Sequence, residues 1–141
     1  MFPGANSPIR RQAAYPIAAA ALLMVSGCNG GTIDRHAIVR DGEALSSIAC
    51  EGALVADGAS RGRSLSPFVR VQADALRLQA ANLADALAQR DVARGLAERV
   101  GREARRATLQ ARLLAELRDH PSDQTAATRV ERRLRMLGGC P

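Results

Sequence analysis

The stretch SPFVRVQADALRLQAANLADAL, from Ser66 to Leu87, decides the fold class because its apolar residues recur at helical spacing. Ser66 can cap a helix with its side chain, and Pro67 suits the first helical position, where the missing N–H group costs nothing. Steps of three and four residues place the apolar residues on one face of a helix. These residues are Val69, Ala73, Leu76, Ala80, Leu83 and Leu87. The stretch therefore predicts an amphipathic helix that starts at Ser66.

A second apolar stripe follows the first, but out of register with it. It consists of Ala93, Leu96, Val100, Ala107, Ala111 and Leu114. The positions three and four residues after Leu87 are Arg90 and Asp91, so the helix either breaks there or rotates its apolar face. One unbroken helix from Ser66 to Asp119 would be about 80 Å long, and a partner chain would have to cover it. A helical hairpin buries both stripes within one chain, and we therefore expect the hairpin.

Turn signals flank this hairpin on both sides. His120-Pro121-Ser122 ends one helix and begins another, which has Asp123 in its first turn and closes at Gly138-Gly139. On the other side, Gly42 to Leu54 has the spacing of a short helix, and the glycine-containing stretch Asp57 to Ser64 reads as a loop. The sequence thus predicts an all-α protein, a small helical hairpin or bundle.

A short apolar run near the N-terminus ends in LLMVSGC, Leu22 to Cys28. The run from Ala13 to Val25 contains Pro16 and is shorter than the roughly 20 residues that a transmembrane helix needs. Arg10-Arg11 precede it and small residues follow it, which is the layout of a secretory signal peptide. We therefore expect this segment to direct export.

Val25-Ser26-Gly27-Cys28 resembles the lipobox of bacterial lipoproteins, whereas no family is recognised after Cys28. The resemblance implies removal of a signal peptide, residues 1–27, and a lipid on Cys28 that anchors the protein on the exported side of the envelope. Asn29 resembles a signal for the outer membrane in cells with two membranes. We expect residues 28–41 to form a flexible tether and residues 42–141 the helical domain.

The two other cysteines form a pair once Cys28 is acylated. Cys50 and Cys140 would then lie in an oxidising compartment, where disulfides persist, so we expect them to bond to each other. The bridge would join the last helix to the first. Metal binding is the rival interpretation, but these cysteines, His36 and His120 show no close ligand spacing. No metal site is therefore predicted.

Clusters of arginine are the most conspicuous chemical feature of the chain, which has a formal net charge of +6 and contains no lysine. Two arginine-rich segments, 90–112 and 129–135, suggest a face that binds an anionic envelope polymer or lipid headgroups. The candidate residues are Arg99, Arg102, Arg105, Arg106, Arg132 and Arg133. A solvated helix surface is the favoured alternative, since Glu98–Arg102 and Glu131–Arg135 are spaced as helical ion pairs.

Catalytic motifs do not emerge from the sequence. The stretch Gly58 to Ser64 lacks the Gly-Lys-Ser/Thr ending of a phosphate-binding loop, and no Gly-x-Ser-x-Gly motif is present. We therefore expect a non-enzymatic structural or protein-interaction module without a cofactor. Its expected partners are the membrane, through the lipid on Cys28, and an unidentified envelope protein, and nucleic acid is not among them. Two other functions stay open: binding of an anionic polymer or headgroups, and a coiled-coil accessory subunit.

Overall fold

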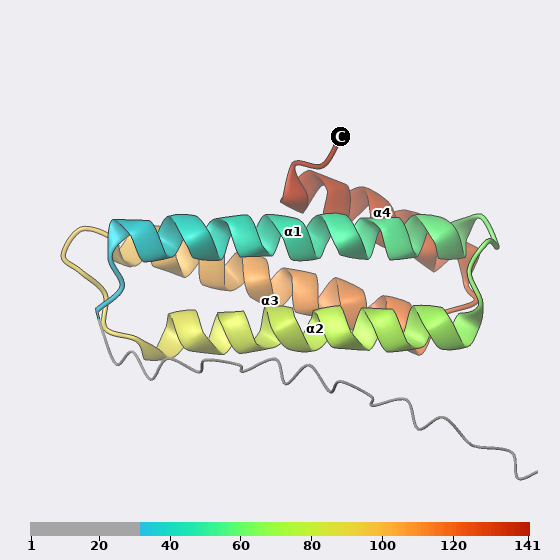
Figure 1. Ribbon diagram of the computed structural model, residues 1–141, viewed down its shortest axis with the longest axis horizontal. Helices are drawn as coiled ribbons and strands as arrows, with labels where there is room; N and C mark the ends of the chain where they lie inside the picture. The colour runs from blue at the N-terminus through green and yellow to red at the C-terminus, as the bar shows by residue number, and fades with distance from the viewer. Residues whose placement is uncertain (1–31) are drawn as a thin grey trace, which may run out of the picture.

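The computed structural model describes residues 32–141 and folds them into four α-helices. They are α1 (Arg35–Ser60), α2 (Ser66–Gln89), α3 (Ala97–Asp119) and α4 (Gln124–Gly138). Successive helices run in opposite directions (Figure 1). The all-α prediction is confirmed. The predicted signal peptide, the lipobox and Cys28 lie outside the described residues.

The predicted hairpin is confirmed as well, since α2 and α3 are separate antiparallel helices that pack on each other. The chain leaves helical geometry at Arg90, whose ψ of 147° is extended. Gly95, with φ of +86°, takes a left-handed conformation that glycine adopts at little cost, just before α3 begins. The break thus falls where charged residues interrupt the apolar spacing.

The helices form two packed layers, α2 with α3 and α1 with α4 (Figure 1). Small residues on α1 allow the layers to approach closely: a Cβ atom added to Gly52 would lie 2.8 Å from Leu114 Cδ2 and 3.0 Å from Leu134 Cδ1. The main core lies between the layers and draws residues from all four helices. They include Ala49, Ala53, Ala56, Val69, Ala73, Leu76, Leu113, Leu114, Leu117, Val130 and Leu134.

A second cluster fills the end of the bundle beyond α4, where α4 no longer accompanies α1 (Figure 1). Its buried residues are Ile33, Ile38, Leu87 and Val100. Ile33 donates its backbone N–H to the Asp91 carbonyl oxygen over 2.7 Å, and Ala93 N–H donates to the Ile33 carbonyl over 3.2 Å. The segment before α1 is therefore clasped by the α2–α3 connection.

This clasp corrects the predicted tether, which is wrong from Ile33 onward. The helix predicted over residues 42–54 begins instead at Arg35, and Asp34 caps it by accepting a 2.7 Å hydrogen bond from Ala37 N–H. The prediction failed because Ile33 is an isolated apolar residue in sequence. Its burial depends on residues 91–93, which only the tertiary fold brings beside it.

Two further boundaries differ from prediction at the opposite end of the bundle. Helix α1 continues to Ser60, so the loop expected over residues 57–64 is confined to Arg61–Leu65. Ser66 is not the N-cap of α2: Leu65 holds that position, and the Ser66 hydroxyl lies 2.7 Å from the Ser122 hydroxyl. This hydrogen bond joins the first residue of α2 to the α3–α4 connection.

The predicted disulfide is confirmed between Cys50 on α1 and Cys140 after α4, with Cα atoms 5.6 Å apart. Gly138 makes this approach possible. A Cβ atom at Gly138 would lie 2.6 Å from Cys140 Sγ and 2.9 Å from Cys50 Sγ, so any side chain there would displace the bridge. Gly139, with φ of +66°, ends α4 as the Gly-Gly pair predicts.

Candidate functional site

The arginines that the sequence groups together are divided among several environments. Arg106 is half-buried between helices, where its guanidinium donates to Glu103 Oε2 (3.2 Å), Ser46 Oγ (2.9 Å) and the Leu137 carbonyl oxygen. Its hydrogen bonds link α3 to α1 and to the end of α4. This placement removes Arg106 from the candidate anion-binding residues, because its donors hold the bundle together.

The other candidates on α3 share no pocket with those on α4. Arg102 pairs with Glu98 at 2.6 Å, as its helical spacing predicts, and Arg99 is exposed. Arg105 lines a shallow hollow between α2 and α3, whose lining also includes Asp85. The candidate arginines were chosen from the sequence by charge alone. In the structure they do not form a single face.

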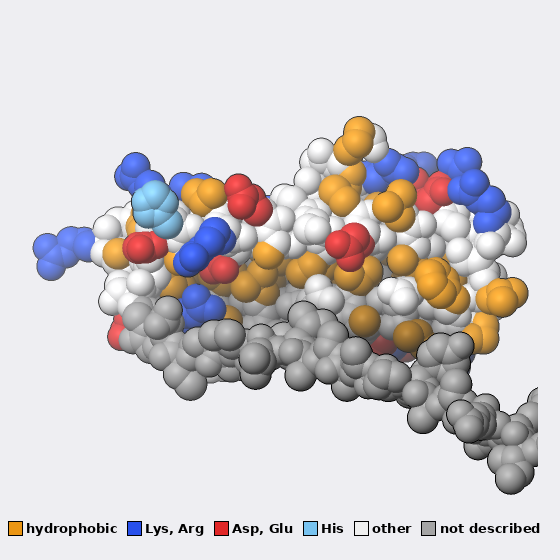
Figure 2. Space-filling model, in the orientation of Figure 1, with side chains coloured by type: hydrophobic (Ala, Val, Ile, Leu, Met, Phe, Trp, Pro, Cys, Tyr) orange, Lys and Arg blue, Asp and Glu red, His pale blue; other side chains and the backbone are white. Residues whose placement is uncertain are grey.

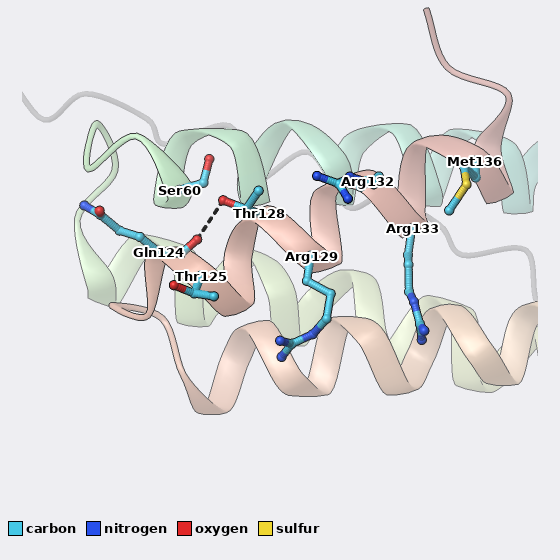
Figure 3. Close-up of a pocket in the computed structure, with 8 residues that line it drawn as sticks. All are labelled: Ser60, Gln124, Thr125, Thr128, Arg129, Arg132, Arg133 and Met136. Atoms are coloured by element: carbon cyan, nitrogen blue, oxygen red, sulfur yellow. Dashed lines mark hydrogen bonds between the residues drawn. The ribbon is translucent and has the colours of Figure 1, made fainter.

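A groove along α4 brings together basic and hydroxyl side chains (Figure 3). It has a volume of about 720 Å³ and is open to solvent. Arg129 and Arg133 reach from α4 toward α3, whereas Arg132 lies on the side of α1 (Figure 3). The lining consists of Ser60, Gln124, Thr125, Thr128, Arg129, Arg132, Arg133 and Met136. It contains no carboxylate.

The three arginines of this α4 groove differ in their freedom to bind a ligand. Arg129 donates a hydrogen bond to Glu116 Oε1 on α3, and this bond raises the pKa of the Arg129 guanidinium. Arg132 and Arg133 are exposed and form no ion pair within residues 32–141. These two are candidates predicted from the sequence, and Arg129 lies in the arginine-rich segment 129–135 without being one, whereas Thr125 and Thr128 were not predicted. The spacing of Thr125, Thr128 and Arg129 by three and four residues on one helical face is the signal that could have revealed them.

Helix α2 carries a second exposed surface, which is uncharged and partly apolar. Leu65, Phe68, Val71 and Leu78 have exposed fractions of 77%, 53%, 65% and 46%. The exposed, uncharged residues of this surface, which we call the α2 stripe, are Leu65, Phe68, Val71, Gln72, Ala75, Leu78, Gln79 and Asn82. Figure 2 shows hydrophobic side chains along the seam between α1 and α2 and at the end that holds their connection.

Asp74 and Arg77 of α2 are engaged with each other and with α3. Asp74 accepts hydrogen bonds from Arg77 at 2.9 Å and from Arg118 of α3 at 3.1 Å, and these bonds lower the pKa of the Asp74 carboxyl. The residues 65, 68, 72, 75, 79 and 82 alternate steps of three and four, which is the spacing of a coiled-coil seam, but Gln72, Gln79 and Asn82 make half of these positions polar. This series was not predicted from the sequence, because the more apolar stripe of α2, which packs inside the bundle, masks it.

No family model, curated protein or solved structure matches this chain. The two surfaces must therefore be judged by their chemistry. In residues 32–141, no three His, Cys, Asp or Glu side chains lie close enough together to hold a metal ion. None of the four helices is long and apolar enough to cross a membrane.

Proposed function

We propose that this protein is a lipid-anchored, non-enzymatic interaction module of the bacterial cell envelope. The resemblance of residues 25–28 to a lipobox supports the anchor. Residues Asn29 to Thr32 separate Cys28 from the clasped Ile33. An extended chain of that length spans at most about 18 Å. The lipid on Cys28 would therefore hold the bundle close to the membrane, with the α2–α3 connection nearest the anchor.

The observation that carries the interaction role is the α2 stripe. An isolated bundle gains nothing from exposing Phe68, Val71 and Leu78 along one helix, and contiguous exposed apolar surface commonly marks an interaction site. The coiled-coil spacing suits a helix of a partner protein. The same surface supports the narrower proposal that the protein is a coiled-coil accessory subunit.

We expect a photo-crosslinking amino acid at Val71 to form a discrete adduct with a partner helix in cells that produce the full-length protein. Phe68→Asp should lower the adduct yield about tenfold, the loss expected for a central apolar contact. A crosslinker at the exposed Arg94 is the control and should give no adduct. Circular dichroism checks that the Phe68→Asp variant is folded, and an unchanged yield in the folded variant would contradict the interaction role.

The anchor is tested separately by Cys28→Ala. Because the thiol of Cys28 is the group that would take the lipid, this substitution should abolish acylation and leave the uncut precursor. Intact-mass measurement and metabolic labelling with a fatty acid detect both changes. Normal maturation of the Cys28→Ala variant would remove the basis for the anchor.

Binding of anionic groups is a second candidate function. The exposed guanidinium groups of Arg132 and Arg133, in a groove whose lining lacks a carboxylate, favour it. The arginines on α3 give it less support, because Arg102 is paired and Arg106 is engaged within the bundle.

A further inference from the structure

The α4 groove has a donor set that suits phosphate groups. Arginine presents planar pairs of N–H donors that match phosphate oxygens, and the adjacent Arg132 and Arg133 offer two such groups. Thr125 and Gln124 add polar side chains at one end of the groove (Figure 3). Glu116 of α3 is paired with Arg129, whereas no ion pair engages Arg132 or Arg133 within residues 32–141.

From this arrangement we propose that the α4 groove binds the phosphate groups of an anionic polymer. The open shape of the groove fits a chain that passes along α4 better than a small ligand that must be enclosed. Arg132 and Arg133 reach to the α1 side and the α3 side of α4 (Figure 3), while Arg129 stays paired with Glu116. Two phosphates of one polymer can therefore meet the guanidinium groups of Arg132 and Arg133.

The position of the groove favours a polymer over the headgroups of the anchoring membrane, an argument that rests on the proposed anchor at Cys28. Ser60, at one end of the groove, is the last residue of α1. Ile33 lies just before the other end of α1, close to Cys28 in the sequence. Helix α1 has 26 residues and is about 39 Å long. The groove thus begins at the end of the bundle opposite the point of attachment (Figure 1).

Fluorescently labelled inorganic polyphosphate is the probe, titrated into the purified mature protein at low salt. Arg132→Gln combined with Arg133→Gln should weaken binding at least about tenfold, since two charge-assisted contacts are lost. Arg94→Gln combined with Arg99→Gln changes the net charge equally at exposed sites outside the groove and should change affinity less than about twofold. Circular dichroism checks that both variants are folded.

Three results would overturn the proposal: no binding of polyphosphate, equal losses in the two double variants, or equally tight binding of a polyaspartate of the same length. Binding to vesicles that contain anionic lipid, without binding to polyphosphate, would also overturn it and identify the membrane as the ligand. The acyl group on Cys28 is measured on the same sample by mass spectrometry. If the protein binds polyphosphate but carries no acyl group, the proposed lipid anchor is refuted and the proposed phosphate-binding groove is supported.

Discussion

Replacing Cys50 and Cys140 together by alanine is expected to lower the free energy of unfolding by about 2–5 kcal/mol. The bridge spans 90 positions, and closing a loop of that size removes about 4.6 kcal/mol of chain entropy from the unfolded state. It also fixes the end of α4, a helix of 15 residues, to α1. Equilibrium unfolding in urea, monitored by circular dichroism, measures the difference.

Reduction supplies the control for this prediction. Dithiothreitol should destabilise the wild-type protein by a similar amount and leave the double alanine variant unchanged. A difference below about 1 kcal/mol between wild type and variant would mean that the helices hold α4 in place without the bridge. Two free thiols in freshly isolated protein would contradict the bridge itself.

Leu114→Ala is expected to destabilise the bundle by about 2–5 kcal/mol. Leu114 is fully buried in the main core, where its Cδ2 methyl packs against the Gly52 backbone. Removing the side chain forfeits its burial and leaves a cavity between the layers. Urea unfolding again gives the change, and Leu54→Ala, at a leucine with 66% of its surface exposed, should cost no more than about 0.5 kcal/mol.

Gly52→Ala provides a sharper test of the same contact. In the wild-type protein the added methyl meets Leu114 at 2.8 Å, which opposes the gain of about 1 kcal/mol from replacing glycine in a helix. In the Leu114→Ala background the 2.8 Å contact is gone and only the 3.0 Å approach to Leu134 Cδ1 remains, so Gly52→Ala should be less destabilising there than in the wild-type protein. Equal effects of Gly52→Ala in both backgrounds would show that the two residues do not contact each other.

Much of the fold could be predicted because helical periodicity is a local property. The stripe from Val69 to Leu87 and the charged residues Arg90 and Asp91 were enough to predict a hairpin. The Cys50–Cys140 pair followed from their even number once Cys28 was set aside. Helix ends were less accurate: Ser66 has the chemistry of a cap, but the partner that its hydroxyl takes, Ser122, is 56 positions away.

The candidate surfaces could be predicted only in part. Arg132 and Arg133 were identified by charge, and the structure adds Arg129 and the threonines that complete the groove. The α2 stripe was missed because its glutamines, Gln72 and Gln79, do not stand out as an interaction surface in a sequence. Gln72 and Gln79 can be assigned to an exposed surface only when the opposite side of α2 is known to be covered by the bundle.

The sequence alone predicted the helical class from its apolar spacing and the pairing of Cys50 with Cys140 from their even number, and it favoured a hairpin over one long helix. Only the tertiary structure decided which polar residues lie inside. Gln110 is fully buried and donates to the Leu45 carbonyl oxygen at 3.1 Å, Arg106 is held among three helices, and Ile33 closes one end of the bundle. Each of these residues gains its environment from segments distant in sequence, whose packing sets the free energy of burying it.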